Sequence, residues 1–180
     1  GFRRVHEVAF GADLVSQALR DLSVAHDDSK CYIGTSCPAA YQFVQKYIPE
    51  LVPNLAPIVS PMTATARVLN KHWPDMKVVF IGPCLSKKLE AIDADLDNEV
   101  DEALLFFEVR EMFEKAGIKP EKLDPIDFDE PKGFLGSIFP VPRGSLRSSH
   151  LDDDPITSNI LEVNGRNSFP EALRALSNGS

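Results

Sequence analysis

The sequence predicts an α/β fold, doubly wound, with a mainly parallel sheet flanked by helices. The first observation is the run 78–81, which is β-branched or aromatic throughout and therefore typical of a parallel strand covered on both faces. The second is that segments with apolar residues at helical spacing follow the strand-like runs, as they do in βαβ units. This alternation of strand and helix favours a parallel sheet.

The individual elements are expected from the same patterns, taken in chain order. Pro38 suits the first turn of its helix, because the N–H that proline lacks would have no partner there. Ser168 as a cap and Pro170 in the first turn mark another helix start. Residues 48–60 contain three prolines and are expected to form a connection. The expected elements are strand 3–10, helix 12–22, strand 31–33, helix 38–47, helix 61–73, strand 78–81, helix 87–94, strand 103–107, helix 108–116, strand 160–163 and helix 168–176.

We expect residues 1–180 to form one domain, taken from a longer protein because the chain begins at Gly1 without methionine. Within it, a possible lobe 1–118 carries the cysteine motifs, and 119–180 is a loop-rich extension with a final strand and helix. Residues 120–155 are rich in Pro, Gly, Asp and Ser. Such a stretch is too long for a plain linker in a compact domain, so it is a candidate functional loop.

Composition excludes several classes of protein. The net charge of −8, from 27 acidic against 19 basic residues, argues against binding to nucleic acid or to an acidic membrane surface. No apolar run approaches the roughly 20 residues that span a bilayer. Three cysteines without a Cys-x-x-Cys pair form neither a disulfide framework nor a complete zinc or ferredoxin site. We therefore expect a cytoplasmic protein whose partners are proteins or small ligands.

The cysteines are the main candidates for chemistry. Cys37 and Cys84 each follow a predicted strand and lie beside a proline, and the helix N-terminus expected at Cys37 favours a thiolate. From the residues alone, a ligand or reactive role and simple packing are equally good interpretations of these two. Cys31 lies inside a predicted strand and is expected to pack as a small apolar residue. Lys87 is either a cation beside the Cys84 thiol or a solvated helix residue that pairs with Glu90.

Several motifs resemble one family. Thr-Ser-Cys-Pro at 35–38, YIPELVPNLAPIVSPM at 47–62 and Pro-Cys-Leu-Ser-Lys-Lys-Leu-Glu at 83–90 resemble the catalytic domain of iron-only hydrogenases. VHEVAFGADLV at 5–15 and EVREMFEKAGI at 108–118 are similar to the same family, so the resemblance covers most of the chain.

The resemblance implies a cofactor. In this family four cysteines hold a 4Fe-4S cubane, and one of them bridges to a diiron unit with cyanide and carbonyl ligands. Cys37 and Cys84 would be the first two cubane ligands, and Lys87 would donate to a cyanide. The remaining motif residues would surround the cofactor: Thr35, Pro38, Gly82, Pro83 and Glu90.

The departures from the family are equally informative. Ser36 stands where the enzymes have the cysteine that relays protons, and a hydroxyl is far less acidic than a thiol. Gly82 replaces a methionine that packs on the diiron unit, and residues 17–19 replace relay glutamates. The family's third motif, Cys-x-x-x-Cys, lies beyond residue 180. We therefore expect this chain alone to purify without iron, and we leave open whether the parent ever holds a diiron unit.

These points favour an iron-sulfur domain of a hydrogenase-like protein that serves redox or hydrogen sensing, or electron transfer. Its expected partners are other domains of the parent, such as ferredoxin-like clusters and sensor or output domains. One alternative is a working hydrogenase, which combines two protons and two electrons into dihydrogen with altered proton delivery. The other is a metal-free interaction domain on the same scaffold. A nucleotide-binding domain is the weakest rival, because no Gly-rich phosphate loop follows a strand.

Overall fold

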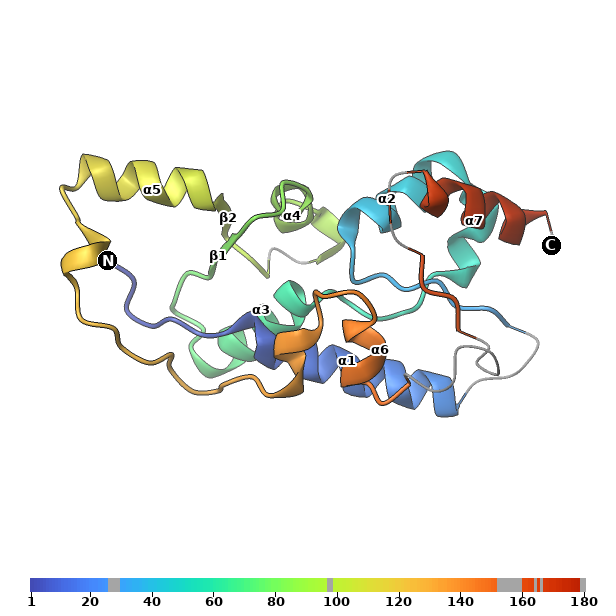
Figure 1. The fold of residues 1–180 in the computed structure, drawn as a ribbon, viewed down its shortest axis with the longest axis horizontal. Helices are drawn as coiled ribbons and strands as arrows, with labels where there is room; N and C mark the ends of the chain where they lie inside the picture. The colour runs from blue at the N-terminus through green and yellow to red at the C-terminus, as the bar shows by residue number, and fades with distance from the viewer. Residues whose placement is uncertain (26–29, 97–98, 152–159, 164, 166, 179–180) are drawn as a thin grey trace.

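The computed structural model describes residues 1–25, 30–96, 99–151, 160–163, 165 and 167–178. Helices dominate the described chain, and one small parallel sheet lies among them (Figure 1). The α-helices and strands are α1 (Val8–Val24), α2 (Pro38–Tyr47), α3 (Pro61–His72), β1 (Val79–Gly82), α4 (Ser86–Ala91), β2 (Glu102–Leu105), α5 (Phe106–Lys115), α6 (Gly144–Ser148) and α7 (Ser168–Ser177). Short 3-10 turns are η1 (Pro49–Asn54), η2 (Ala94–Leu96), η3 (Pro120–Lys122) and η4 (Leu135–Ile138).

The sheet consists of β1 and β2, which pair in parallel with Phe80 opposite Ala103. The crossover between them contains α4, so β1, α4 and β2 form the βαβ unit that the alternating pattern predicts. The predicted α/β class and the parallel strand direction are thus confirmed. Among the described residues the sheet has two strands.

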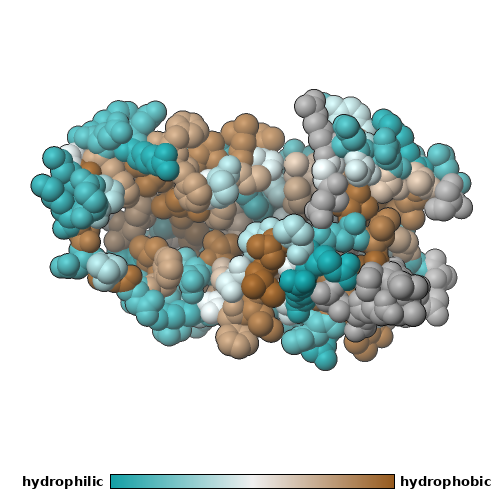
Figure 2. All heavy atoms as spheres, in the orientation of Figure 1, coloured by the Kyte–Doolittle hydropathy of each residue, from teal (hydrophilic) through white to brown (hydrophobic). Residues whose placement is uncertain are grey.

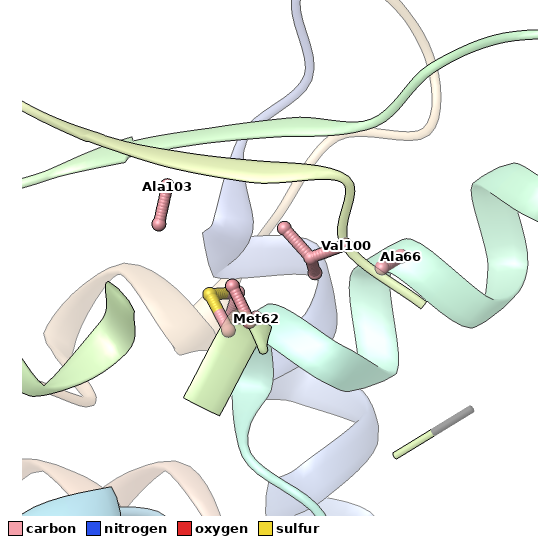
Figure 3. Packing of buried hydrophobic residues seen from close by; sticks show 5 residues of the cluster. Met62, Ala66, Val100 and Ala103 are labelled. Atoms are coloured by element: carbon pink, nitrogen blue, oxygen red, sulfur yellow. The ribbon is translucent and has the colours of Figure 1, made fainter. Parts of the chain in front are cut away.

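A first hydrophobic core lies between α3 and one face of the sheet. Met62 and Ala66 of α3 pack with Ala103 of β2 and with Val100 just before it (Figure 3). Phe80 of β1 packs against the same cluster. Small side chains on α3 allow the helix to approach the strands closely. This core fixes α3, and therefore its N-terminus, relative to the end of β1.

Helix α1 packs across α3 and also contacts η4 and α6 (Figure 1). Gly11 makes the crossing possible, because a Cβ at this position would lie 2.2 Å from the carbonyl oxygen of Pro61. On another side of α1, the buried hydroxyls of Ser16 and Ser148 are 2.7 Å apart. The loop-rich residues after 118 thus return to cover α1.

A second core joins α2 to the last helix. Val44 and Ile48 pack with Leu173 of α7, and the rings of Phe43 and Phe169 lie edge to face with centroids 5.7 Å apart. Figure 1 shows α7 lying along α2. Described parts of 119–180 therefore pack on both α1 and α2. The division into a lobe 1–118 and an extension 119–180 stays a prediction.

Three of the predicted strands are wrong. Residues 3–7 form no strand, and 8–10 are the first turn of α1. Around 31–33 there is only an isolated bridge between Ile33 and Leu55, and 160–163 are irregular. Each run was expected from its apolar residues, but among the residues that the structure describes none of the three has a neighbouring strand with which to form a ladder. By contrast, the helix predicted at 38–47 has those bounds, and α3 ends one residue before its predicted end.

The start of the last helix differs slightly from its prediction. Helix α7 begins at Ser168 with Asn167 as its cap residue, so the predicted cap is one residue too late. The connection 48–60 includes the 3-10 turn η1. Within the described residues, no helix is both long enough and apolar enough to cross a bilayer.

Candidate functional site

Cys37 occupies the cap position of α2, with an extended backbone and an exposed, free thiol. Pro38 follows as the first helical residue and is buried. The hydroxyl of Thr35 donates to the carbonyl oxygens of Ala56 and Ile58, at 3.1 and 2.5 Å. The loop before α2 is thereby tied to the connection that leads into α3, which holds the Cys37 thiol at a fixed place on the surface.

Cys84 follows β1 after Gly82 and Pro83 and is partly buried. Its sulfur lies 3.0 Å from the hydroxyl of Ser86, and its carbonyl oxygen accepts from the amide of Lys87 at 3.2 Å. Cys84 therefore starts the turn that becomes α4. The thiol follows a parallel strand, as predicted, but the expectation that this strand is covered on both faces is wrong, because β1 is only partly buried and Ile81 is 38% exposed.

Lys87 and Glu90 form a buried ion pair on α4. The Lys87 ammonium is 2.6 Å from a Glu90 carboxylate oxygen, and the side chains are only 12% and 7% exposed. This excludes the interpretation of Lys87 as a solvated helix residue. Lys88, by contrast, pairs with Glu108 at 2.9 Å in a partly exposed position.

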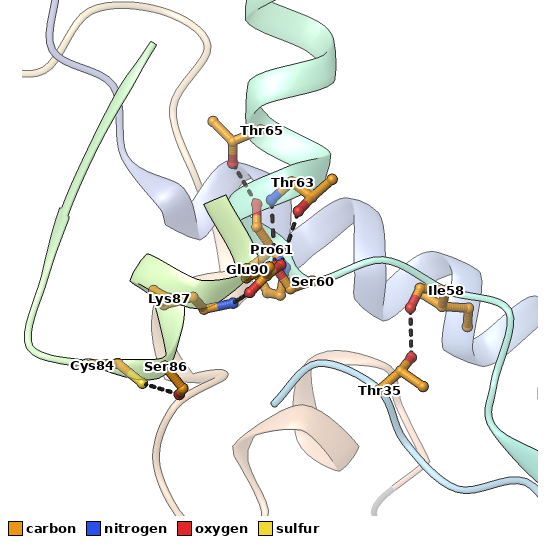
Figure 4. Close-up of polar contacts among 10 residues, drawn as sticks. All are labelled: Thr35, Ile58, Ser60, Pro61, Thr63, Thr65, Cys84, Ser86, Lys87 and Glu90. Carbon is orange, nitrogen blue, oxygen red and sulfur yellow. Dashed lines mark hydrogen bonds and ion pairs between the residues drawn. The ribbon is translucent and has the colours of Figure 1, made fainter. Parts of the chain in front are cut away.

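The other Glu90 oxygen accepts hydrogen bonds from two residues of the α3 start (Figure 4). Thr63 donates through its hydroxyl at 2.9 Å, and the Ser60 hydroxyl donates through a short hydrogen bond. The Ser60 oxygen also accepts from the Thr63 amide at 3.4 Å, which caps α3. A buried carboxylate needs such partners, because a buried charge without them destabilises the folded state. Removing one partner of a buried ion pair typically costs roughly 3–5 kcal/mol of stability.

Sequence reasoning missed Ser60 and Thr63 as site residues. The Ser60-Pro61 pair is a helix-start signal and could have indicated a cap. Its pairing with a carboxylate 30 residues away could not be seen in any local pattern.

One cavity is lined by residues from both cysteine motifs, although neither Cys37 nor Cys84 is among them. It has a volume of about 210 Å³, and its lining includes Thr35 and Pro38 from one motif and Glu90 from the other, together with Ser60. A second cavity of about 400 Å³ lies between α1, η4 and α6 and is lined by none of the predicted site residues. The structure thus brings the predicted residues Thr35, Pro38 and Glu90 to a common hollow.

Cys31 is exposed rather than packed, because the segment around it forms no strand, so the packing prediction is wrong. Across the described ranges, no group of three or more His, Cys, Asp or Glu side chains is arranged to hold a metal ion. Cys37 and Cys84 are therefore at most part of a ligand set.

The fold and these motifs define a class of protein, the hydrogenase-like α/β domains. The family model for the iron only hydrogenase large subunit, C-terminal domain, matches residues 1–170. The chain belongs to this family.

Solved structures of the FeFe-hydrogenase HydA1 from Chlamydomonas reinhardtii are similar to this chain. One variant has 25% identity and a TM-score of 0.67 over 93% of this chain and 48% of its own. A second variant has 28% identity and a TM-score of 0.61, over 74% and 38%. An apo form of a third variant, at 24% identity and a TM-score of 0.66, covers 93% and 49% and shows the fold. The chain thus spans about half or less of the length of these hydrogenases.

Proposed function

We propose that this chain supplies two thiolate ligands, Cys37 and Cys84, to a 4Fe-4S cluster in a larger hydrogenase-like protein. In that protein the domain serves redox or hydrogen sensing, or electron transfer, rather than turnover. The observation that carries the proposal is that both thiols are free, Cys37 exposed and Cys84 partly buried, and that residues of both motifs, though neither thiol, line one cavity. The named relatives are hydrogenases, which supports iron-sulfur chemistry for this scaffold.

The residues fit the group in part. Iron-sulfur clusters are held by cysteine thiolates, normally four, and two suitable thiols are present here. When bound, such a cluster accepts and releases single electrons. Two further thiolates must come from outside the described residues, so the domain is half of a binding site.

The chain's own residues have distinct tasks in this proposal. Cys37 and Cys84 bind, while Thr35 and Pro38 hold the Cys37 loop in place. Lys87 lies three residues after Cys84, and Glu90 fixes the position of its ammonium through a 2.6 Å ion pair.

Ser36 supports a role other than turnover. It occupies the position that relays protons in the enzymes, and its hydroxyl releases a proton far less readily than a thiol does. Fast hydrogen evolution needs proton delivery at each cycle, whereas sensing or electron transfer does not.

The direct test is iron and acid-labile sulfide content, with electron paramagnetic resonance, on the native polypeptide after anaerobic reconstitution. We expect about four iron atoms at this site, the number in a cubane. Hydrogen evolution in the same preparation should be far below that of a hydrogenase. Evolution at a normal hydrogenase rate would instead establish the catalytic alternative.

The metal-free interaction domain is a second candidate. It is favoured by the absence, among described residues, of any group of three or more metal-binding side chains. Reconstituted native polypeptide that retains no iron, while it stays folded, would establish it. The expected partners in every case are other domains of the parent, and cytoplasmic location stays a prediction.

A further inference from the structure

The larger cavity, of about 400 Å³, lies between α1, η4 and α6, and none of its lining residues belongs to a cysteine motif. Its floor is polar and buried. The hydroxyls of Ser16 and Ser148 are 2.7 Å apart there, and Ser149 is only 1% exposed. The mouth of the cavity is lined by exposed residues: Gln17, Arg20, Phe134 and His150. This cavity is called the α1–α6 pocket.

The α1–α6 pocket has the size of a small-molecule site. One water takes up a share of roughly 30 Å³, whereas small-molecule sites typically measure about 300–1,000 Å³. Phe10, Phe134 and Leu135 give the pocket apolar walls, which suit a hydrocarbon or aromatic body. Figure 2 shows hydrophobic and hydrophilic residues side by side on the surface over η4 and α6. An occupant that matches this lining has both an apolar and a polar part.

Asp13 of α1 fixes one wall of the pocket. Its two carboxylate oxygens accept from the backbone amides of Phe134 and Gly136, at 2.6 and 2.5 Å. Gly136 lies so close to α1 that an added Cβ would be 2.0 Å from the Ala9 carbonyl oxygen. These contacts hold η4 on α1, so the pocket is formed by the fold itself. They also engage both oxygens of the Asp13 carboxylate.

His150 has a backbone conformation that glycine normally adopts. It follows Ser149, the cap residue of α6, and its φ is 56°. The His150 amide donates to the Arg147 carbonyl oxygen at 3.1 Å, and the Leu151 amide donates to the Leu146 carbonyl oxygen at 2.8 Å. These two bonds form a Schellman motif, in which glycine is preferred at this position because a Cβ is strained there. The position instead carries an imidazole at the pocket mouth, and strained residues of this kind cluster at ligand sites.

The polar groups at the mouth favour a singly charged anion. Neither the Arg20 nor the His150 side chain forms a hydrogen bond or ion pair with the residues that the structure describes, so both can donate to a ligand. A planar guanidinium matches a carboxylate through two parallel hydrogen bonds. The Asp13 carboxylate in the same lining repels a second negative charge. A carboxylate monoanion therefore fits better than a phosphate dianion.

We infer that the α1–α6 pocket binds a small carboxylate with an apolar or aromatic body. The guanidinium of Arg20 and the imidazole of His150 bind the carboxylate at the mouth, and the walls around Phe10 and Leu135 enclose the body. This site goes beyond the proposed function, because it shares no residue with the cysteine motifs and needs no iron. Its test gives the same answer whether or not the native polypeptide holds a cluster.

Ligand-observed NMR on the native polypeptide tests this inference. Saturation-transfer titrations give the Kd of acetate, phenylacetate and indole-3-acetate, and phenylacetamide is the neutral control with the same body as phenylacetate. We expect saturable binding of the two aromatic carboxylates, tighter than that of acetate. Phenylacetamide should bind about tenfold more weakly or worse, because it cannot form charge-assisted hydrogen bonds. Failure of all three carboxylates to saturate, or equal affinity for phenylacetate and phenylacetamide, would overturn the inference.

Three variants separate ligand binding from folding. Arg20→Gln should raise the Kd of phenylacetate about tenfold or more. Arg110→Gln, at an exposed position of α5, is the matched control and should leave the Kd unchanged. His150→Gly should also weaken binding without lowering the Tm, because glycine adopts the left-handed conformation without strain. Wild-type affinity in both Arg20→Gln and His150→Gly would overturn the inference.

Discussion

The Lys87 ammonium lies 2.6 Å from the Glu90 carboxylate on the short helix α4, and almost none of either side chain reaches solvent. The pair is held from outside the helix, because Ser60 and Thr63 at the start of α3 donate to the other Glu90 oxygen. Removing water from two charges is expensive, and the geometry must compensate for it. The placement of α4, and of the cysteine that precedes it, therefore depends on a contact with α3.

Glu90→Gln should strongly destabilise the protein. The substitution leaves the Lys87 ammonium buried without a carboxylate, which typically costs about 3–5 kcal/mol. Urea unfolding followed by circular dichroism measures the free energy of unfolding. Lys88→Met is the matched control, since it removes a partly exposed pair on the same helix and should cost less than about 1 kcal/mol. If the two variants lose similar amounts of unfolding free energy, the buried pair contributes no more to stability than the partly exposed one.

The cysteines should differ in their effect on iron. In the reconstituted native polypeptide, Cys37→Ala and Cys84→Ala should each abolish the paramagnetic signal of the cluster, because each removes a thiolate ligand. Cys31→Ala is the control, because Cys31 is exposed and its sulfur lies outside both motifs. Iron content and the resonance spectrum give the readout. A full cluster in Cys84→Ala would contradict the assignment.

Asp101 should contribute to stability in a pH-dependent way. Burial raises the pKa of this carboxyl, but hydrogen bonds from the Lys77 ammonium (2.6 Å) and the Val78 amide (2.7 Å) outweigh it, so the pKa lies below its ordinary 3.8. A lowered pKa in the folded state gives stability that is present above about pH 4 and is lost as pH falls through the folded pKa.

Asp101→Asn should therefore lower the free energy of unfolding at pH 7, by less than about 1 kcal/mol because the pair is partly screened. The difference from wild type should shrink as the pH falls below 3.8 through the lowered pKa of the folded state, which urea unfolding at pH 7 and at pH 3 measures. Asp75→Asn serves as the control, since the Asp75 side chain forms no hydrogen bond or ion pair with the described residues and is exposed. An equal deficit at both pH values would contradict the role given to the Asp101 charge.

Gly11→Ala should destabilise the crossing of α1 and α3. The added Cβ would lie 2.2 Å from the Pro61 carbonyl oxygen, so the helices must move apart, and overpacking of this kind costs roughly 1–3 kcal/mol. Gly34→Ala is the control, because its Cβ would meet no atom within 4 Å. Thermal unfolding of both variants compares the effects, and an unchanged Tm for Gly11→Ala would disprove the tight crossing.

Local patterns in the sequence were sufficient for much of the fold. Apolar spacing and a proline in the first turn located α2 and α3, and the continuous apolar run located β1. The strand predictions failed where an apolar run has no second strand beside it among the described residues, as at 31–33. A β-strand needs backbone hydrogen bonds to another segment, and a local pattern does not show which distant segment that is. The same failure explains why Cys31 was expected to be buried.

What the sequence determined by itself is the family, the placement of Cys37 at the start of α2 and of Cys84 after β1, and the capacity of Lys87 to pair with Glu90. These properties depend on residues within a few positions of one another, whose conformations are set by local sterics and backbone hydrogen bonds. Only the tertiary structure decided that the pair is buried, that Ser60 and Thr63 hold it, and that a second cavity lies between α1, η4 and α6. Burial and long-range hydrogen bonds depend on which distant segments meet, and that is settled by packing of the whole chain.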